Sequence, residues 1–593
     1  MSTTITHPSV DVVIIGAGVM GGEIAIKLAL NGNKVVALEK GPYWNYATDF
    51  AISKYDEWGA QTLHKFDAPV VQQTNTQRNT STQFAMPLRR EAFRTALGFG
   101  VGGAAHHYAA NYGRFDPWTY AENSNTVSRY GAAYLAAANP NNDVQDFPFT
   151  YNDYLPYYKD HEQGWGVTGP NQNPVCPNST FPLPNHPITA LGMAFQAAAE
   201  SLGINNWPNP TAIASQPYMN QYGVQINACV YDGYCSCSGY PCETGAKAAS
   251  DARTIPPAIS AGLDLRTNAY VYRIDTSPTT GLATQVRYYD AAGNIHLQPA
   301  TAIVSCIWGF LNPWMMLVSG IGAAYNPTTV TGSMGRGPNE PTGAPTRTAA
   351  GTLPIGMNNT VWAGNAAMGS YSTYDFANDN FDHTGVAVPY IGGTRNTYGG
   401  TASSPGLIAI AGAGSAANIG STYKAAQLNR TQVLKQNVSA SGAGMQLPQT
   451  THYVDLDPHY VDIYGDPLPR YTQDYAPNSA NASNDSVRLW TPVVQKMGVT
   501  ITTGAAVVPG STHEVSYGIH IRGGIRIGSD PSLSALNKWQ QIWSGATNVF
   551  AAGEDTEPVG SNEQTGGTHP AAVTAHAAAE GIMMYLKSPG PLV

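Results

Sequence analysis

Charged side chains are scarce in this chain. Lysine, arginine, aspartate and glutamate make up 12% of its 593 residues, which is about half of the usual share. The formal net charge is −9, with 30 basic and 39 acidic residues. Nucleic acids are bound through clustered lysine and arginine, and this chain contains no such cluster. We therefore expect no surface for nucleic acid.

Long apolar runs are missing as well. No run reaches the roughly 18 apolar residues of a membrane-spanning helix, and the most apolar later segment, 302–317, contains Asn312 and Pro313. The first residues lack a basic segment followed by an apolar stretch, so we expect no signal peptide here. The hydrophobic content of 42% is nevertheless that of a globular protein.

A complete strand–turn–helix–strand pattern lies near the N-terminus. Residues 11–15 predict a buried strand, the next residues open a helix that runs to about Asn31, and residues 34–38 predict a second strand. The turn between the first strand and the helix reads Gly16-Ala17-Gly18-Val19-Met20-Gly21. This spacing is typical of a dinucleotide-binding βαβ unit.

Each residue of this fingerprint has its own role. Gly16 allows the tight turn, Gly18 lets the backbone approach a pyrophosphate, and Gly21 lets the helix pack closely on the strand. The free N–H groups at the helix N-terminus attract phosphate. Glu39, at the tip of the second strand, can accept hydrogen bonds from ribose hydroxyls. We therefore predict a bound dinucleotide.

The remaining chain divides by composition. Residues 302–318, the stretch TNVFAAGED and the alanine-rich final helix extend the nucleotide fold, whereas residues 135–185 contain few helix signals. Residues 325–480 are poor in charge and alternate in places, which predicts a largely antiparallel sheet. The expected fold class is mixed α/β, or α+β. Its Rossmann-like nucleotide-binding domain covers 1–330 and 485–593, and the inserted substrate-binding domain covers 331–484, with parts of 44–95 and 135–225 contributing.

Four of the six cysteines fall within a short loop, 228–250: Cys229, Cys235, Cys237 and Cys242. Disulfides would require an oxidising compartment, and a chain of this size hardly needs them. Zinc sites usually show paired CxxC spacings or nearby histidines, which this loop lacks. An iron–sulfur cluster needs several thiolates among small residues, and this loop supplies both. We favour the cluster, with disulfides and structural thiols as the alternatives.

The chain resembles the glucose–methanol–choline oxidoreductase family. The N-terminal fingerprint, GVGG at 100–103, TNVFAAGED and the final helix carry this resemblance over the whole length. Within the family it is similar to flavoprotein subunits of bacterial membrane-bound sugar and sugar-acid dehydrogenases, of the gluconate 2-dehydrogenase and fructose dehydrogenase type. That similarity is carried by GVGGAAHH, CETGAKAASDART, DPHYVDIYGDPLPRYTQDY and HIRGGIRIGSDPSLSALNKWQQIW.

The resemblance implies two cofactors. The dinucleotide is then FAD, and the residues expected to hold it are Gly16, Gly18, Gly21, Glu39, Gly102, Gly103, His107, Gly553 and Glu554. It further implies that His107 carries the flavin covalently, with His106 as the alternative. A [3Fe-4S] cluster is expected in the cysteine loop, with Cys242 as its last ligand and two of Cys229, Cys235 and Cys237 as the others.

Two histidines are the catalytic candidates. The resemblance places His520 and His569 beside the reactive edge of the flavin. Oxidation of an alcohol by hydride transfer requires loss of the hydroxyl proton, which a neutral imidazole accepts well near neutral pH. We expect His520 to be the general base and His569 to assist it. Sugar dehydrogenases usually have Asn at the second position, and related oxidases have His.

The expected reaction is oxidation of a hydroxyl group of a sugar, polyol or sugar acid, with gluconate favoured. An oxygen-using oxidase is the alternative, although an oxidase needs no cysteine cluster to export electrons. A non-redox flavoprotein, such as a lyase with structural FAD, and a disulfide-stapled binding protein that has lost catalysis are further alternatives, and the two retained histidines argue against the last. The chain lacks Cys-x-x-Cys-His for haem attachment. The resemblance therefore implies a multihaem cytochrome c subunit, a small signal-bearing companion and a place on the periplasmic face of the membrane.

Overall fold

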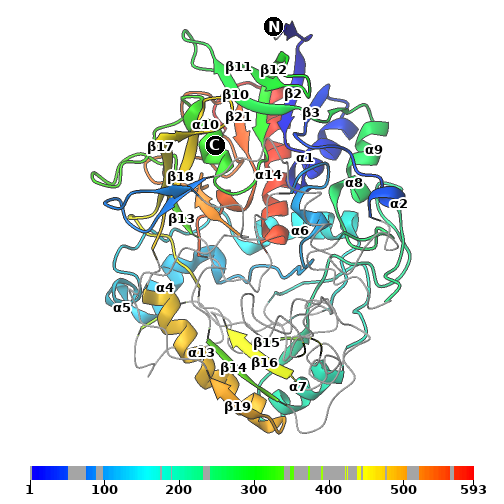
Figure 1. Ribbon diagram of the computed structural model, residues 1–593, viewed down its shortest axis with the longest axis vertical. Coiled ribbons are helices and arrows are strands. Elements are labelled where there is room, and N and C mark those ends of the chain that lie inside the picture. The colour runs from blue at the N-terminus through cyan, green and yellow to red at the C-terminus, as the bar shows by residue number, and fades with distance from the viewer. Residues whose placement is uncertain are drawn as a thin grey trace.

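The structure is a computed structural model, shown in Figure 1. It describes the following residues: 3–50, 75–87, 98–171, 173, 176–188, 190–231, 241–339, 347–352, 371–373, 389–391, 421, 424, 437–442, 445–474, 477–503, 520–560 and 567–592. Most of the expected insert between 340 and 444 thus lies outside the described residues, as do Cys235 and Cys237.

A parallel sheet forms the centre of the nucleotide fold (Figure 1). Strand β2 has β3 and then β9 on one side, and β12 and then β21 on the other. The bounds of these strands are β2 Val10–Ile15, β3 Val35–Leu38, β9 Asp264–Arg266, β12 Ile295–Ser305 and β21 Val549–Ala551. Because these strands are parallel, their carboxyl ends lie at the same edge of the sheet, which is where ligands bind in such folds.

Alternating side chains of β2 face two separate cores. Val12 and Ile14 pack with α1 (Val19–Leu30), α9 (Ile255–Ser260) and α14 (Thr568–Lys587). Val13 and Ile15 pack on the opposite face, towards α10 (Leu311–Val318). Because successive strand residues point to opposite faces, a continuous apolar strand can serve both cores.

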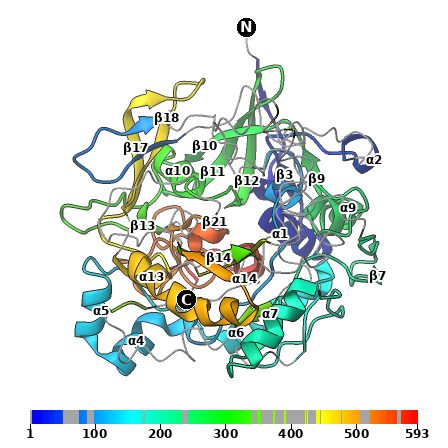
Figure 2. The same ribbon diagram turned by 60° about the horizontal axis from the view of Figure 1, so that its bottom comes forward.

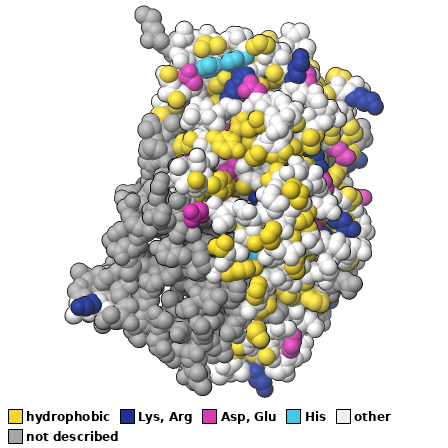
Figure 3. All heavy atoms as spheres, turned by 90° about the vertical axis from the view of Figure 1, so that its right-hand side faces the viewer, with side chains coloured by type: hydrophobic (Ala, Val, Ile, Leu, Met, Phe, Trp, Pro, Cys, Tyr) yellow, Lys and Arg dark blue, Asp and Glu magenta, His cyan; other side chains and the backbone are white. Residues whose placement is uncertain are grey.

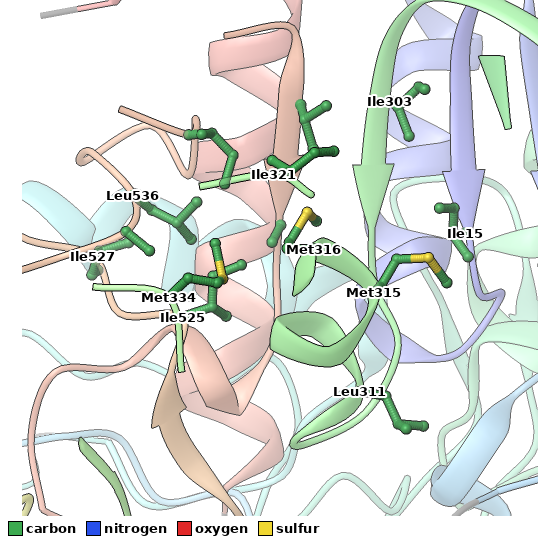
Figure 4. Close-up of a cluster of buried hydrophobic side chains, with 14 of the residues drawn as sticks. Ile15, Ile303, Leu311, Met315, Met316, Ile321, Met334, Ile525, Ile527 and Leu536 are labelled. Carbon is green, nitrogen blue, oxygen red and sulfur yellow. The ribbon is translucent and has the colours of Figure 1, made fainter. Parts of the chain in front are cut away.

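Figure 4 shows the second of these cores. Ile15 of β2 lies beside Met315 of α10, and Ile303 of β12 lies farther along the same cluster. The same cluster continues through Met334 to the C-terminal residues Ile525, Ile527 and Leu536. Segments more than five hundred residues apart thus share one apolar core beneath the nucleotide fold.

Strand β12 is long enough to pair with both parallel and antiparallel neighbours in the same sheet. Beyond its parallel part, it pairs antiparallel with β11 (Ala283–Tyr289), which pairs with β10 (Tyr270–Thr276), and parallel with β1 (Thr4–Thr6). The stretch 264–275 forms two strands, β9 and β10. Asn268, with φ of 53°, turns the chain between them.

A second sheet of six strands is mainly antiparallel. Its order is β20, β13, β17, β18, β4 and β5, with one parallel pair between β18 and β4. The bounds are β4 Thr76–Arg78, β5 Met86–Pro87, β13 Arg336–Asn339, β17 Tyr453–Val461, β18 Pro467–Thr472 and β20 Arg522–Gly524. The mixed fold class is therefore confirmed, and strands from four separate parts of the chain build this sheet.

Two long helices, α6 and α13, were not predicted from the sequence. α6 spans Tyr151–Trp165 and begins with a capping box, in which Thr150 accepts from the Asp153 backbone and Asp153 accepts from Thr150. α13 spans Pro477–Lys496 and packs beside β14 (Arg347–Thr352) and β16 (Asn437–Gly442). Figure 2 shows α13 next to β14. Residues 135–185 contain few helix signals, and the capping box at Thr150 is the one that marks the start of α6.

The smaller elements complete the description. They are α2 Tyr46–Asp49, η2 Gly103–His106, η3 Thr119–Ala121, α4 Glu122–Tyr130, α5 Ala132–Ala138, α7 Ala190–Glu200, β6 Asn206–Pro208, β7 Tyr218–Met219, β8 Gln225–Ile226, α8 Ser250–Arg253, β15 Tyr371–Thr373, β19 Thr500–Thr503 and η6 Glu554–Thr556. None of the helices in the described part is both long and apolar enough to cross a membrane. On the face shown in Figure 3, charged side chains stand singly among polar and apolar ones.

Candidate active site

A cavity of about 290 Å³ opens at the carboxyl edge of the parallel sheet. Its wall includes the last residues of β2 and β3 and the residues that follow β12 and β21. Most of its lining is apolar, and its charged or titratable lining residues include Glu39, His107, His520 and Glu554. This is the place where open α/β sheets bind nucleotides.

Two glycine turns meet on one side of the cavity. A Cβ on Gly103 would lie 3.2 Å from the Cα of Gly18, so the turn after β2 and the turn before η2 are in close contact. Gly16, with φ of 93°, and Gly102, with φ of 101°, adopt backbone conformations that favour glycine. Gly18 caps α1, and no side chain occupies the cap, so its first N–H groups remain available to a phosphate.

Glu39 lies in the cavity wall at the end of β3. Its carboxylate accepts hydrogen bonds from the backbone N–H of Ala17 at 3.0 Å and of Gly41 at 2.9 Å. These bonds fix the acid beside the first glycine turn, where a ribose hydroxyl would reach it. The fingerprint residues are thus assembled as a dinucleotide site requires.

His106 and His107 point in different directions. His107 lines the cavity. His106 is buried, with Nε2 2.9 Å from the Val101 carbonyl and 3.2 Å from Asp251, and it does not belong to the cavity wall of the described residues. Only His107 of the two is therefore placed to contact a ligand in the cavity.

His520 and Glu554 form a pair at the cavity wall. His520 Nδ1 lies 2.9 and 3.1 Å from the two carboxylate oxygens of Glu554. Glu554 itself follows Gly553, at the end of β21, and both line the cavity. The carboxylate orients the imidazole and favours a proton on Nδ1, which leaves Nε2 as the proton acceptor.

The ring of His569 lies outside the cavity wall. Its neighbour Thr568 lines the cavity, but the fully buried ring of His569 does not. Nδ1 is 2.8 Å from the Tyr112 carbonyl, and Nε2 is 3.3 Å from Glu162. The structure therefore brings His520 to the cavity without bringing the His569 ring to the same wall.

Glu162 explains why the His569 ring turns inward. Its carboxylate also accepts two hydrogen bonds from Arg114, each at 2.7 Å. Burial opposes ionisation, but Arg114 and His569 keep the pKa of Glu162 below its usual value. The buried Arg114–Glu162 ion pair needs further polar partners, and His569 is one of them.

The two arginines that follow His520 are structural. Arg522 is completely buried and lies 2.9 Å from Glu557. Arg526 is 2.7 Å from Asp143, which also pairs with Arg336 of β13. Neither arginine lines the cavity in the described part of the chain, so neither is positioned to bind a substrate carboxylate there.

Two of the four clustered cysteines lie in the described part. Cys229 and Cys242 are half-buried against the same apolar cluster. The backbone N–H of Lys247 points at Cys242 Sγ from 3.4 Å, and Thr244 Oγ1 lies at the same distance. An N–H directed at sulfur suits a thiolate ligand of an iron–sulfur cluster.

Sequence reasoning missed the buried polar network behind the cavity. Tyr112, Arg114 and Glu162 belong to it, and they come from segments without a motif. The only signal that could have located Glu162 on a helix is the capping box at Thr150. Trp308 and Trp314 of the cavity wall were also missed, because an aromatic after a strand carries no specific spacing.

Comparison with known proteins agrees with this geometry. The profile described as "FAD binding domain" matches residues 11–125, and "GMC oxidoreductase" matches 143–360. The chain is 32% identical to the gluconate 2-dehydrogenase flavoprotein of Pantoea cypripedii, over 98% of this chain and 95% of that protein. It is 25% identical to the fructose dehydrogenase large subunit of Gluconobacter japonicus, over 92% and 93% respectively.

A solved structure shows the same fold. The pyridoxine 4-oxidase from Mesorbium loti superposes with a TM-score of 0.55, covering 96% of this chain and 99% of that one. Its sequence identity of 14% makes this a likeness of fold alone. The near full-length relative at 32% identity and the cavity with its two glycine turns establish the class. The chain belongs to the GMC oxidoreductases, FAD-dependent enzymes that act on CH–OH donors.

Proposed function

We propose that this protein is a dehydrogenase that oxidises a hydroxyl group of a sugar, polyol or sugar acid, with gluconate as the favoured substrate. The observation that carries the proposal is the His520–Glu554 pair at 2.9 Å on the wall of the FAD cavity. The relatives named above, a gluconate and a fructose dehydrogenase, support this substrate class.

The residues present fit FAD. The first turn of α1 and the adjoining turn at Gly102 and Gly103 would hold the pyrophosphate, and Glu39 would hold a ribose. His107 faces the same cavity and is the proposed point of covalent attachment. When bound, FAD supplies the acceptor for the hydride of the substrate.

His520 takes the hydroxyl proton in this proposal. With Nδ1 held by Glu554, Nε2 accepts the proton, and the carboxylate stabilises the imidazolium that results. His569 is proposed as a positioning residue. It ties the start of α14, next to the cavity-lining Thr568, to the buried Arg114–Glu162 pair.

The electron path is the finer part of the proposal. Cys242, together with two of Cys229, Cys235 and Cys237, would hold a [3Fe-4S] cluster that accepts single electrons. A multihaem cytochrome c subunit would receive them and pass them to quinone. A small companion subunit with its own signal would carry the chain to the periplasmic face of the membrane. The dehydrogenase subunits among the relatives support such partners.

The test is an acceptor-linked assay with gluconate, 2-ketogluconate, fructose, glucose and sorbitol, together with peroxide detection. We expect dye reduction with one of these substrates and little peroxide.

In stopped flow, His520→Ala should slow flavin reduction by about 100-fold or more with FAD retained. Glu554→Gln should slow it less and move the acidic limb of the pH–rate profile to lower pH, because the charge that stabilises the imidazolium is gone.

Three results would contradict the proposal. Peroxide formed in step with substrate would make the protein an oxidase. A His520→Ala enzyme that reduces its flavin within a few-fold of the wild-type rate would remove His520 from the mechanism. Release of all flavin on acid precipitation would exclude covalent attachment at His107.

A further inference from the structure

Three helices bring a carboxylate and two imidazoles together behind the FAD cavity. Glu23 comes from the middle of α1, His161 from α6 and His576 from α14. The helix α14 packs against both α1 and α6, and Figure 1 shows the three side by side. All three side chains are buried, with exposures of 0%, 0% and 3%. None of them lines the cavity or takes part in the proposed chemistry.

Their ligand atoms converge on one point. One ligand atom from each of the three residues lies within 4.8 Å of the others. His161 Nδ1 is 3.2 Å from Glu23 Oε1, and His576 Nε2 is 3.0 Å from Glu23 Oε2. Yet His161 Nδ1, His576 Nε2 and Glu23 Oε2 make no hydrogen bond of acceptable geometry. Buried polar atoms without a hydrogen bond are costly, so this convergence calls for a ligand.

The outward atoms of the three residues are occupied. His161 Nε2 lies 3.3 Å from the Tyr112 hydroxyl, and His576 Nδ1 lies 3.2 Å from Asp160. Glu23 Oε1 accepts a hydrogen bond from the indole N–H of Trp165. Metal-bound histidines characteristically use the second ring nitrogen in this way, which fixes the ring and directs the other nitrogen at the ion.

We propose that Glu23, His161 and His576 bind a divalent transition-metal ion of the zinc type. Two imidazole nitrogens and one carboxylate form a ligand set that Zn²⁺ accepts, with a fourth position for water or the second carboxylate oxygen. The cluster lies close to the surface, because Asp160 beside His576 has a side chain that is 35% exposed. It would clamp α1 and α14, whose N-terminal ends both line the FAD cavity, to α6.

The test uses the full chain, stripped of metal with EDTA and then given Zn²⁺. We expect bound zinc to rise by about one ion per chain and the melting temperature to rise with it, since an ion bound only by the folded state stabilises that state. Glu23→Gln and His576→Gln should each lose this one ion. His452→Gln, a matched change of a buried histidine outside the cluster, should keep it. Cys242→Ser should keep it too, which separates this site from the cysteine loop.

The proposal does not depend on how any one variant folds. Crystals of the wild-type protein soaked in Zn²⁺ should give an anomalous peak at the zinc edge between the three side chains. Absence of that peak, or equal zinc content in wild type, Glu23→Gln and His576→Gln, would overturn the proposal. The cluster would then hold a proton on His576, shared with Glu23 and Asp160, in place of a metal ion.

Discussion

At the scale of single residues, the first glycine turn separates folding from ligand binding. A Cβ at Gly21 would lie 1.9 Å from the Gly16 carbonyl oxygen, which no real Cβ can tolerate. A Cβ at Gly18 would meet only the Cα of Gly103 at 3.9 Å, an ordinary contact. Gly21 is thus needed to close the turn between β2 and α1, whereas Gly18 leaves room at the cavity wall.

Alanine substitutions should reveal this difference. Gly21→Ala should greatly reduce the yield of folded protein, because the turn cannot close. Gly18→Ala should still fold in good yield and melt cooperatively but should hold much less FAD, since the added methyl group occupies the approach of the pyrophosphate. The ratio of flavin to protein absorbance and a thermal melt measure both effects. Full flavin content in folded Gly18→Ala would show that the pyrophosphate does not lie there.

The sequence could locate these residues because their chemistry requires fixed spacing. Gly16, Gly18, Gly21 and Glu39 lie where the fingerprint predicts them, and the parallel sheet around them is confirmed. The orientation of His569 could not be read in the same way. Its ring is oriented towards Glu162, which lies more than four hundred residues earlier in the sequence, and no local pattern predicts such a partner.

At the scale of elements, predictions succeeded where apolar periodicity or glycine turns mark the boundaries. α1, β12, β21 and α14 are of this kind. α13 was missed because its residues are polar and rich in Asn and Ser, and its stability comes from packing beside β14 and β16. The cysteine loop lacks such periodicity, and two of its four cysteines lie outside the described residues.

The helix α4 begins with a buried carboxyl group that should make stability depend on pH. Burial, with a contribution from Asp116, raises the pKa of Glu122 from 4.5 to about 8. The folded protein therefore holds a proton that the unfolded chain releases above pH 4.5, and its stability falls as pH rises from 4.5 to 8. Each pKa unit corresponds to about 1.4 kcal/mol, so the total loss is several kcal/mol.

Glu122→Gln should remove this loss. The amide oxygen can still accept from Trp118 and Thr126, which both donate to Glu122 at 3.3 Å. We expect the variant to melt about 2 °C or more above wild type at pH 8 and close to wild type at pH 5. Glu200→Gln, on the exposed end of α7, serves as the control and should change neither melt. An equal shift at both pH values would contradict the proton-linked explanation.

At the scale of the whole molecule, distant segments combine to build the FAD cavity. The cavity draws on both ends of the chain, with Gly16 and Glu39 from the start and His520 and Glu554 from the last quarter. Lys247 connects Cys242 with the residues next to the cavity. Its backbone N–H points at Cys242 Sγ, and its Nζ donates to the His106 carbonyl at 2.9 Å. His106 ends η2, and His107 after it lines the cavity. A cluster held by Cys242 would thus be joined to the flavin side of the molecule through two short contacts.

This connection predicts that Cys242→Ser separates the two half-reactions. The variant should lose iron and acid-labile sulfide, while substrate still reduces its flavin within a few-fold of the wild-type rate, because His520 and Glu554 are untouched. Electron delivery to a cytochrome c subunit purified with the chain should fall at least about tenfold, since the single-electron carrier is missing. Cys176→Ala, a buried cysteine far from the loop in sequence, should retain both reactions. A Cys242→Ser complex that keeps its iron and reduces cytochrome at the wild-type rate would show that electrons leave the flavin by another route.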